Sequence, residues 1–171
     1  DQMEAWADAA LKSLKASGYK QLYQQSIDAG YMMHGEYNYH NILFDATSEK
    51  DNYGHRKLNV YTMNFDHFKK NVQVEDLYYF LRKAMEKQGF KEWISDGILN
   101  AYSAIIPLGK NELEYLKNRL MYPEKFFKVA NSYYHSNKAW ISIKNVEKMQ
   151  MAVRQMNEKE HFLNHFFDAR I

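Results

Sequence analysis

Residues 34–44 constrain this chain more than any other stretch, because a short polar loop there runs directly into an apolar strand. Within the loop, the acid Glu36 lies five residues before the amide Asn41. A carboxylate can accept a proton from a hydroxyl group, and an amide oxygen can bind a divalent cation. A strand directly after the amide holds both groups still relative to the fold. The stretch therefore indicates a chemical site, and an ordinary polar loop is the alternative.

The following residues extend this pattern. The sequence predicts a polar hairpin over 45–56 and a second strand over 57–63, followed by Asn64 and Asp66 and then by a helix that opens near Val74. In phosphoryl-transfer enzymes of the kinase kind, the loop acid accepts the hydroxyl proton and the amide binds magnesium. A second metal-binding acid follows at a strand end, about twenty residues later. Loop, hairpin, acidic strand end and helix occur in that order here, so a kinase-type region is the leading interpretation.

The His34-Gly35-Glu36 loop with Asn41 resembles that of aminoglycoside phosphotransferases and choline kinases, in which the acid is usually Asp. The fuller resemblance is to bacterial spore-coat proteins of the coat-protein-S type, a kinase-like branch of the same superfamily. It covers about residues 31–166. The stretches specific to this branch are residues 76–83, 122–128, 131–134 and Lys138-Ala139-Trp140.

The resemblance implies a fold that is mainly α with a small β-hairpin element, the C-terminal helical lobe of a protein-kinase-like fold, in one domain over residues 1–171. It implies ATP-dependent phosphorylation of a hydroxyl group, with Mg²⁺ and ATP bound only by a full-length, two-lobed protein. The alternative is a pseudokinase that serves as a scaffold of the spore coat. Other spore-coat proteins are the expected partners, and the cytoplasm or the spore coat is the expected location.

The same resemblance implies roles for particular residues. Catalytic positions fall on Glu36, Asn41 and His34, although His34 is better suited to brace the loop backbone than to transfer protons. Metal ligands fall on Asn41, Asn64 and Asp66. Asp76 is expected to brace the loop or cap the following helix, because an acid near this place does so in the superfamily.

Two positions depart from the active pattern. Glu36 replaces the usual Asp and lengthens the side chain by one methylene, and a misplacement of about 1 Å can cost on the order of a hundredfold in rate. Asn64 stands where the family has a metal-binding Asp, so a hard divalent ion loses a charged ligand there. Asp66 is expected to substitute, because residues two apart on a strand face the same side. Enzyme and pseudokinase both remain open.

Composition excludes several other classes of protein. The net charge is +2 at pH 7 with Lys and Glu interspersed, which argues against a nucleic-acid surface. Cysteine is absent, so the chain has no disulfide and no thiolate metal site. The seven glycines are scattered, and none forms a phosphate-cradling cluster. Because the residues before His34 read as helical, we expect the first kinase lobe to be absent from this chain and the piece alone to be inactive.

The helical periodicity predicts helices over 3–16, 19–29, 77–88, 91–106, 111–121 and 123–135, and a last one from 143 or 145 to 169. A helical binding module unrelated to kinases is a further alternative. His161 and His165 have the spacing of two zinc ligands, but the zinc-peptidase signature requires Glu directly after the first His, and Phe162 stands there. The sequence therefore disfavours a zinc peptidase.

Overall fold

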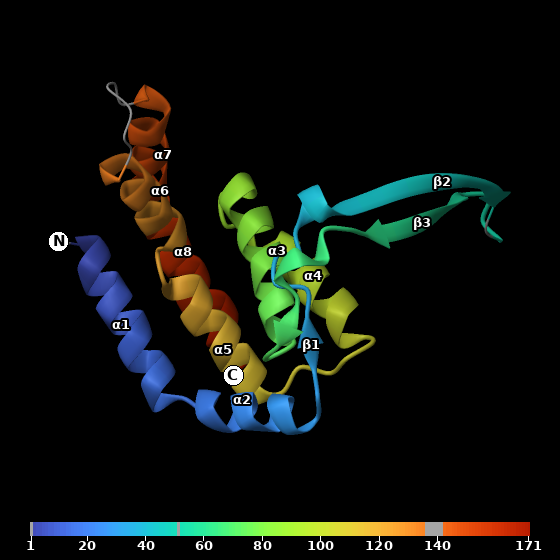
Figure 1. Ribbon diagram of the computed structural model, residues 1–171, viewed down its shortest axis with the longest axis horizontal. Coiled ribbons are helices and arrows are strands. Elements are labelled where there is room, and N and C mark those ends of the chain that lie inside the picture. The colour runs from blue at the N-terminus through green and yellow to red at the C-terminus, as the bar shows by residue number, and fades with distance from the viewer. Residues whose placement is uncertain (1, 51, 136–141) are drawn as a thin grey trace. The chain divides into compact units, whose positions relative to one another are not determined.

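The computed structural model describes residues 2–50, 52–135 and 142–171 (Figure 1). The chain forms two compact units. We call Asp1–Leu22 with Ala84–Ile171 the helical unit, and Tyr23–Lys83 the loop unit. The stretch Lys138-Ala139-Trp140, which contributed to the family resemblance, lies outside the described residues.

The loop unit holds two small antiparallel sheets. Strand β1 (Met32–Met33) pairs with β4 (Lys69–Lys70), and β2 (Ile42–Lys50) pairs with β3 (Arg56–Thr62). The second pair is a long hairpin, visible in Figure 1, and a single 3₁₀ turn (Tyr39–Asn41) leads into it. The small β element is thus confirmed.

The hairpin is longer than the sequence predicts. Residues 45–56 were expected as a polar connection, yet β2 continues to Lys50. The reason is cross-strand pairing: Phe44 lies opposite Val60, and Ala46 lies opposite Leu58. Alternation along both strands puts these four side chains on one face. Strand β4 adds β-structure at Lys69–Lys70, beyond the predicted strand over 57–63.

Helices make up most of the described chain, which confirms a mainly α fold. In the helix predicted over 91–106, Trp93 and Ile105 are 71% and 83% exposed. Of the observed helix Glu92–Ser103, only Ser95 and Leu99 are buried. No helix in the described ranges is long and apolar enough to cross a membrane. The helices are α1 Gln2–Ala16, α2 Tyr19–Asp28, α3 Val74–Gln88, α4 Glu92–Ser103, α5 Lys110–Met121, α6 Glu124–Tyr134, α7 Ile143–Arg154, α8 Met156–Phe162 and the π-helix Leu163–Phe167.

The predicted last helix is divided rather than continuous. Gln155 ends α7 with a ψ of −2°, and α8 begins at the next residue. A ψ near zero interrupts regular α geometry, and the Gln155 side chain donates from Nε2 to the carbonyl oxygen of Glu86 at 3.0 Å. A tertiary contact therefore decides where this helix breaks.

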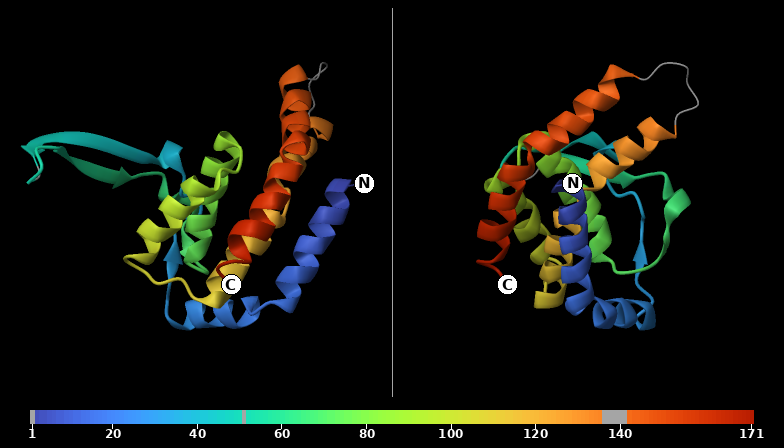
Figure 2. Two further views of the ribbon diagram at one scale, coloured as in Figure 1. Left: turned by 180° about the vertical axis from the view of Figure 1, so that it is seen from behind. Right: turned by 90° about the vertical axis from the view of Figure 1, so that its left-hand side faces the viewer.

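The core of the helical unit lies around the C-terminal helices. Helix α1 packs against α5, α5 against the π-helix, and α6 runs beside α7 (Figure 2). Large aromatic side chains fill this core, with Phe162 and Phe167 at 1% and 0% exposure. Each buried large apolar side chain contributes about 1.5–3 kcal/mol of transfer free energy. These aromatic side chains therefore belong to the core.

Candidate functional site

A sharp turn at Gly35 opens the polar loop after β1. Its φ is +90°, and a Cβ atom built there would lie 2.3 Å from the His67 carbonyl oxygen. Glycine alone tolerates both the left-handed backbone and that close approach. Sequence reasoning gave this glycine no role, because only the fold brings the His67 carbonyl against it.

Asp76, in the first turn of α3, holds the start of the loop. Its Oδ2 accepts a hydrogen bond from the backbone N–H of His34 at 2.6 Å, and its Oδ1 accepts one from that of Gly35 at 3.0 Å. Hydrogen bonds to a carboxylate are among the stronger ones in proteins. Asp76 therefore braces the loop, as expected, but it does not cap the helix, because α3 already begins at Val74.

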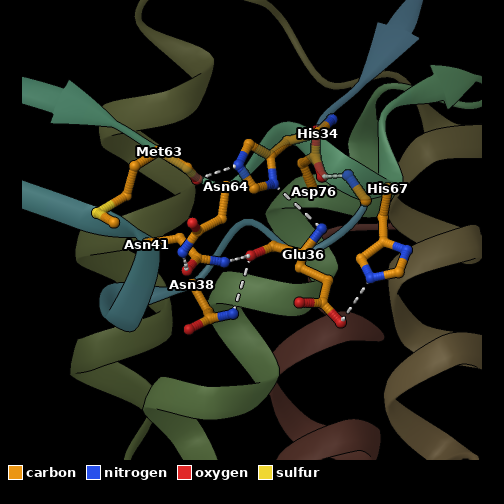
Figure 3. Close-up of polar contacts among 9 residues, drawn as sticks. His34, Glu36, Asn38, Asn41, Met63, Asn64, His67 and Asp76 are labelled. Atoms are coloured by element: carbon orange, nitrogen blue, oxygen red, sulfur yellow. Dashed lines mark hydrogen bonds and ion pairs between the residues drawn. The ribbon is translucent and has the colours of Figure 1, made fainter.

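His34 is buried beneath the loop, and both of its ring nitrogens face backbone groups (Figure 3). Nε2 lies 2.8 Å from the Met63 carbonyl oxygen, and the Glu36 backbone N–H points to Nδ1 at 3.2 Å. A carbonyl only accepts, so Nε2 carries the proton and Nδ1 is the acceptor. One neutral tautomer thus satisfies both contacts and ties the loop to the end of β3.

A chain of amide hydrogen bonds joins the proposed metal ligands. Asn41 donates from Nδ2 to the Glu36 carbonyl oxygen at 2.9 Å, and Asn64 donates from Nδ2 to Asn41 Oδ1 at 2.9 Å. Because the Glu36 carbonyl can only accept, the orientation of the Asn41 amide is determined: its nitrogen faces the loop and its oxygen faces Asn64. The structure thus joins the side chains of Asn64 and Asn41 to the backbone carbonyl of Glu36.

Asn38 adds a contact that sequence reasoning did not identify. Its Nδ2 donates to the same Glu36 carbonyl at 2.9 Å, and its Oδ1 accepts from the His40 backbone N–H at 3.0 Å. Asn is a preferred residue at the start of a helical turn for this reason. The sequence Asn38-Tyr39-His40-Asn41 carried that signal.

The Glu36 carboxylate points away from this network (Figure 3). Its side chain is 55% exposed, and Oε1 lies 3.9 Å from Nε2 of His67. The loop therefore offers a solvent-accessible carboxylate on a braced backbone. Such a group can orient or deprotonate a hydroxyl.

Asp66 does not take the place predicted for it. The expectation required Asn64 and Asp66 to lie two apart on one strand, but β3 ends at Thr62. The backbone of Asn64 is in the left-handed conformation, with φ 63° and ψ 61°, and Asp66 follows within the 3₁₀ turn Phe65–His67. Within the described residues, Asp66 forms no hydrogen bond or ion pair with Asn41 or Asn64.

The donor set for a cation at this loop consists of neutral amides. In the part of the chain that the structure describes, no group of three or more His, Asp or Glu side chains could hold a metal ion. The amide oxygens of Asn41 and Asn64 are the groups able to contact Mg²⁺. One of these two oxygens, Asn41 Oδ1, already accepts a hydrogen bond from Asn64.

The fold and this loop together define a class of protein. Almost the whole chain, 99%, superimposes with a TM-score of 0.81 on 47% of an aminoglycoside phosphotransferase from Alicyclobacillus acidocaldarius subsp. acidocaldarius DSM 446. The chain thus spans just under half the length of that protein, and at 15% sequence identity the likeness establishes the fold alone. The fold is kinase-like.

Sequence comparison then gives the family. The family model described as "Spore coat putative kinase YutH" matches residues 37–166. The chain belongs to this spore-coat, kinase-like family, which confirms the resemblance drawn from its motifs. No curated protein matches the chain.

Proposed function

We propose that this protein is a pseudokinase of the spore coat, which keeps the kinase-like fold and its braced loop for a structural role and does not transfer phosphate. One observation carries the proposal: the Asn64 amide donates to Asn41 Oδ1 at 2.9 Å. In a kinase site, Mg²⁺ lies between the loop amide and the second acid. Here the N–H of one amide satisfies the oxygen that the ion would contact.

The substitution explains why no ion is needed. A carboxylate at position 64 would place an oxygen against Asn41 Oδ1, and two facing acceptors require a cation between them. The Asn64 amide removes that requirement and adds one hydrogen bond, worth about 0.5–1.5 kcal/mol net. The loop is thereby closed without metal. Other proteins of the coat are the partners that a scaffold of this family would bind.

A weak phosphotransferase is the second candidate, and the exposed Glu36 carboxylate favours it. In a full-length protein with bound nucleotide, Glu36 would orient the acceptor hydroxyl, and Asn41 with Asn64 would contact Mg²⁺. Magnesium would neutralise charge on the phosphates and on the leaving oxygen.

Asn64→Asp in the full-length protein separates the two candidates. The variant loses the hydrogen bond to Asn41 and places a charge against an acceptor, so we expect the free energy of unfolding to fall by about 1–3 kcal/mol. Thermal melts of wild type and variant, with and without Mg²⁺-ATP, report any bound ligand as a raised Tm. The scaffold proposal expects no ligand-dependent rise in either protein.

Asn52→Asp, in the exposed turn of the β2–β3 hairpin, is the matched control for adding one charge. A rise in Tm with Mg²⁺-ATP in the Asn64→Asp protein alone would favour a weakened enzyme. ATP hydrolysis or hydroxyl phosphorylation should then appear in that variant and disappear when Glu36→Gln is added. Turnover by the wild-type protein would overturn the scaffold proposal outright.

A further inference from the structure

Two histidines in the helical unit form a cluster that the kinase-like loop does not use. His161 is the penultimate residue of α8, and His165 lies in the π-helix that follows. Their imidazole rings stack with centroids 5.5 Å apart and planes 22° apart. Both side chains are exposed, so neither ring contributes to the core.

A carboxylate from another helix orients one of these rings. Glu92, in the first turn of α4, has its Oε1 2.9 Å from Nδ1 of His165. In the neutral imidazole, the carboxylate accepts and Nδ1 carries the proton, so Nε2 keeps its lone pair. A carboxylate that hydrogen-bonds the far nitrogen of a histidine is the usual partner of a metal-binding histidine.

The local backbone and the surrounding side chains agree with a binding role. His165 lies within the π-helix Leu163–Phe167, and single-turn π segments are frequently found at functional sites. Asn157, Glu160 and Asn164 line an open hollow together with the two histidines. An ion held by the two imidazoles would complete its coordination with water in this hollow.

We propose that His161 and His165 bind one divalent transition-metal ion, of the Zn²⁺ or Ni²⁺ type, through their Nε2 atoms, with Glu92 as the carboxylate that orients His165. Tetrahedral Zn²⁺ with Zn–N bonds of about 2.0 Å places its two nitrogens about 3.3 Å apart. Because the ring centroids are 5.5 Å apart, the two side chains must rotate for both nitrogens to reach one ion. Mg²⁺ prefers oxygen ligands and is not expected to bind here.

Isothermal titration of tag-free protein with ZnCl₂ and with NiCl₂ tests the site. We expect one saturable site with micromolar affinity in the wild-type protein and no heat from MgCl₂. His161→Ala and His165→Ala should each weaken the affinity at least about tenfold, because each removes one of two imidazole ligands. Glu92→Gln should weaken it about 10–100-fold, the usual effect of removing such an orienting carboxylate.

His135→Ala is the matched control, because His135 is also exposed at a helix end and its ring nitrogen Nδ1 lies 3.0 Å from the carbonyl oxygen of Asn131 in its own helix. The affinity of the His135→Ala protein for Zn²⁺ and Ni²⁺ should equal that of the wild-type protein. Circular dichroism checks that each variant is folded. Substitutions at exposed positions are expected to leave the fold intact. Millimolar binding by the wild-type protein, or an affinity equal to that of the wild-type protein in either the His161→Ala or the His165→Ala variant, would overturn the proposal. An unchanged affinity in Glu92→Gln would overturn the role given to that carboxylate.

Discussion

At the scale of single residues, the loop depends on Gly35 as much as on the groups that could carry chemistry. Its φ of +90° and the 2.3 Å separation between a built Cβ and the His67 carbonyl oxygen leave no room for a side chain. The Asp76 carboxylate then accepts hydrogen bonds from the backbone N–H groups of His34 and Gly35. Backbone geometry and one carboxylate thus set where Glu36 lies.

Gly35→Ala should therefore destabilise the loop. Backbone strain of this kind costs about 1–3 kcal/mol, and the overlap with the His67 carbonyl adds to it. Urea denaturation should show a lower midpoint, and amide exchange should show faster exchange of the His34 and Gly35 N–H groups. Gly97→Ala is the control: nothing lies within 4 Å of a Cβ there, and it is in α4, so the free energy of unfolding should rise by up to about 1 kcal/mol. Equal effects of the two substitutions would contradict the structure of the turn.

At the scale of elements, the β2–β3 hairpin differs most from its prediction. One of its faces carries Phe44, Ala46, Leu58 and Val60, all exposed. The opposite face is mixed: Leu43 lies opposite Tyr61 and Asp45 opposite Asn59. Farther along the hairpin, Lys57 and Glu49 pair at 3.0 Å. Cross-strand pairing stabilises this extended ribbon, because its apolar side chains find no cover within the loop unit.

Leu58→Thr should accordingly change the stability of this chain very little. Leu58 is 58% exposed, and Thr suits a strand, so the free energy of unfolding should move by less than about 0.5 kcal/mol. Leu81→Ala, at a fully buried position of the same unit, should cost about 2–5 kcal/mol. Urea denaturation of both variants makes the comparison. A loss above 1 kcal/mol for Leu58→Thr, on the order of a buried contact, would mean that this face is covered in solution.

At the scale of the whole molecule, the kinase-like fold occurs in a chain whose sequence shows no glycine-rich, phosphate-cradling cluster. The glycines of the 171 residues are scattered, and the two amides of the loop hydrogen-bond to each other. Membership of the spore-coat family and likeness to a phosphotransferase therefore establish the fold and the family.

Residues 1–171 should consequently bind Mg²⁺-ATP no more tightly than about 1 mM, equivalent to about −4 kcal/mol. Titration calorimetry of ATP with MgCl₂ into this chain measures the affinity directly. Asn64→Asp in the same chain is the comparison, and it should remain as weak, because one carboxylate supplies no phosphate cradle. Micromolar affinity in the wild-type chain would show that its own residues form a nucleotide site.

The sequence by itself determined the class of this protein, because its strongest signals are local. Glu36 and Asn41 five residues apart, with the apolar strand after them, indicate a chemical site, and the 3.6-residue periodicity predicts the helices. The resemblance of these motifs to the spore-coat family implies the kinase-like helical lobe. The bracing role of His34 also followed from the sequence. These features depend on neighbours along the chain.

What only the tertiary structure decided depends on contacts between distant residues. The His67 carbonyl against Gly35, the Asn64 amide against Asn41 and the Glu92 carboxylate against His165 join residues 23 to 73 positions apart. The contact of Gln155 with Glu86, where the last helix breaks, also joins residues far apart in the sequence. Hydrogen-bond geometry depends on distances of a few tenths of an ångström, and periodicity cannot supply that precision across such separations. The chemistry open to the loop, metal-dependent or metal-free, was therefore decided by packing.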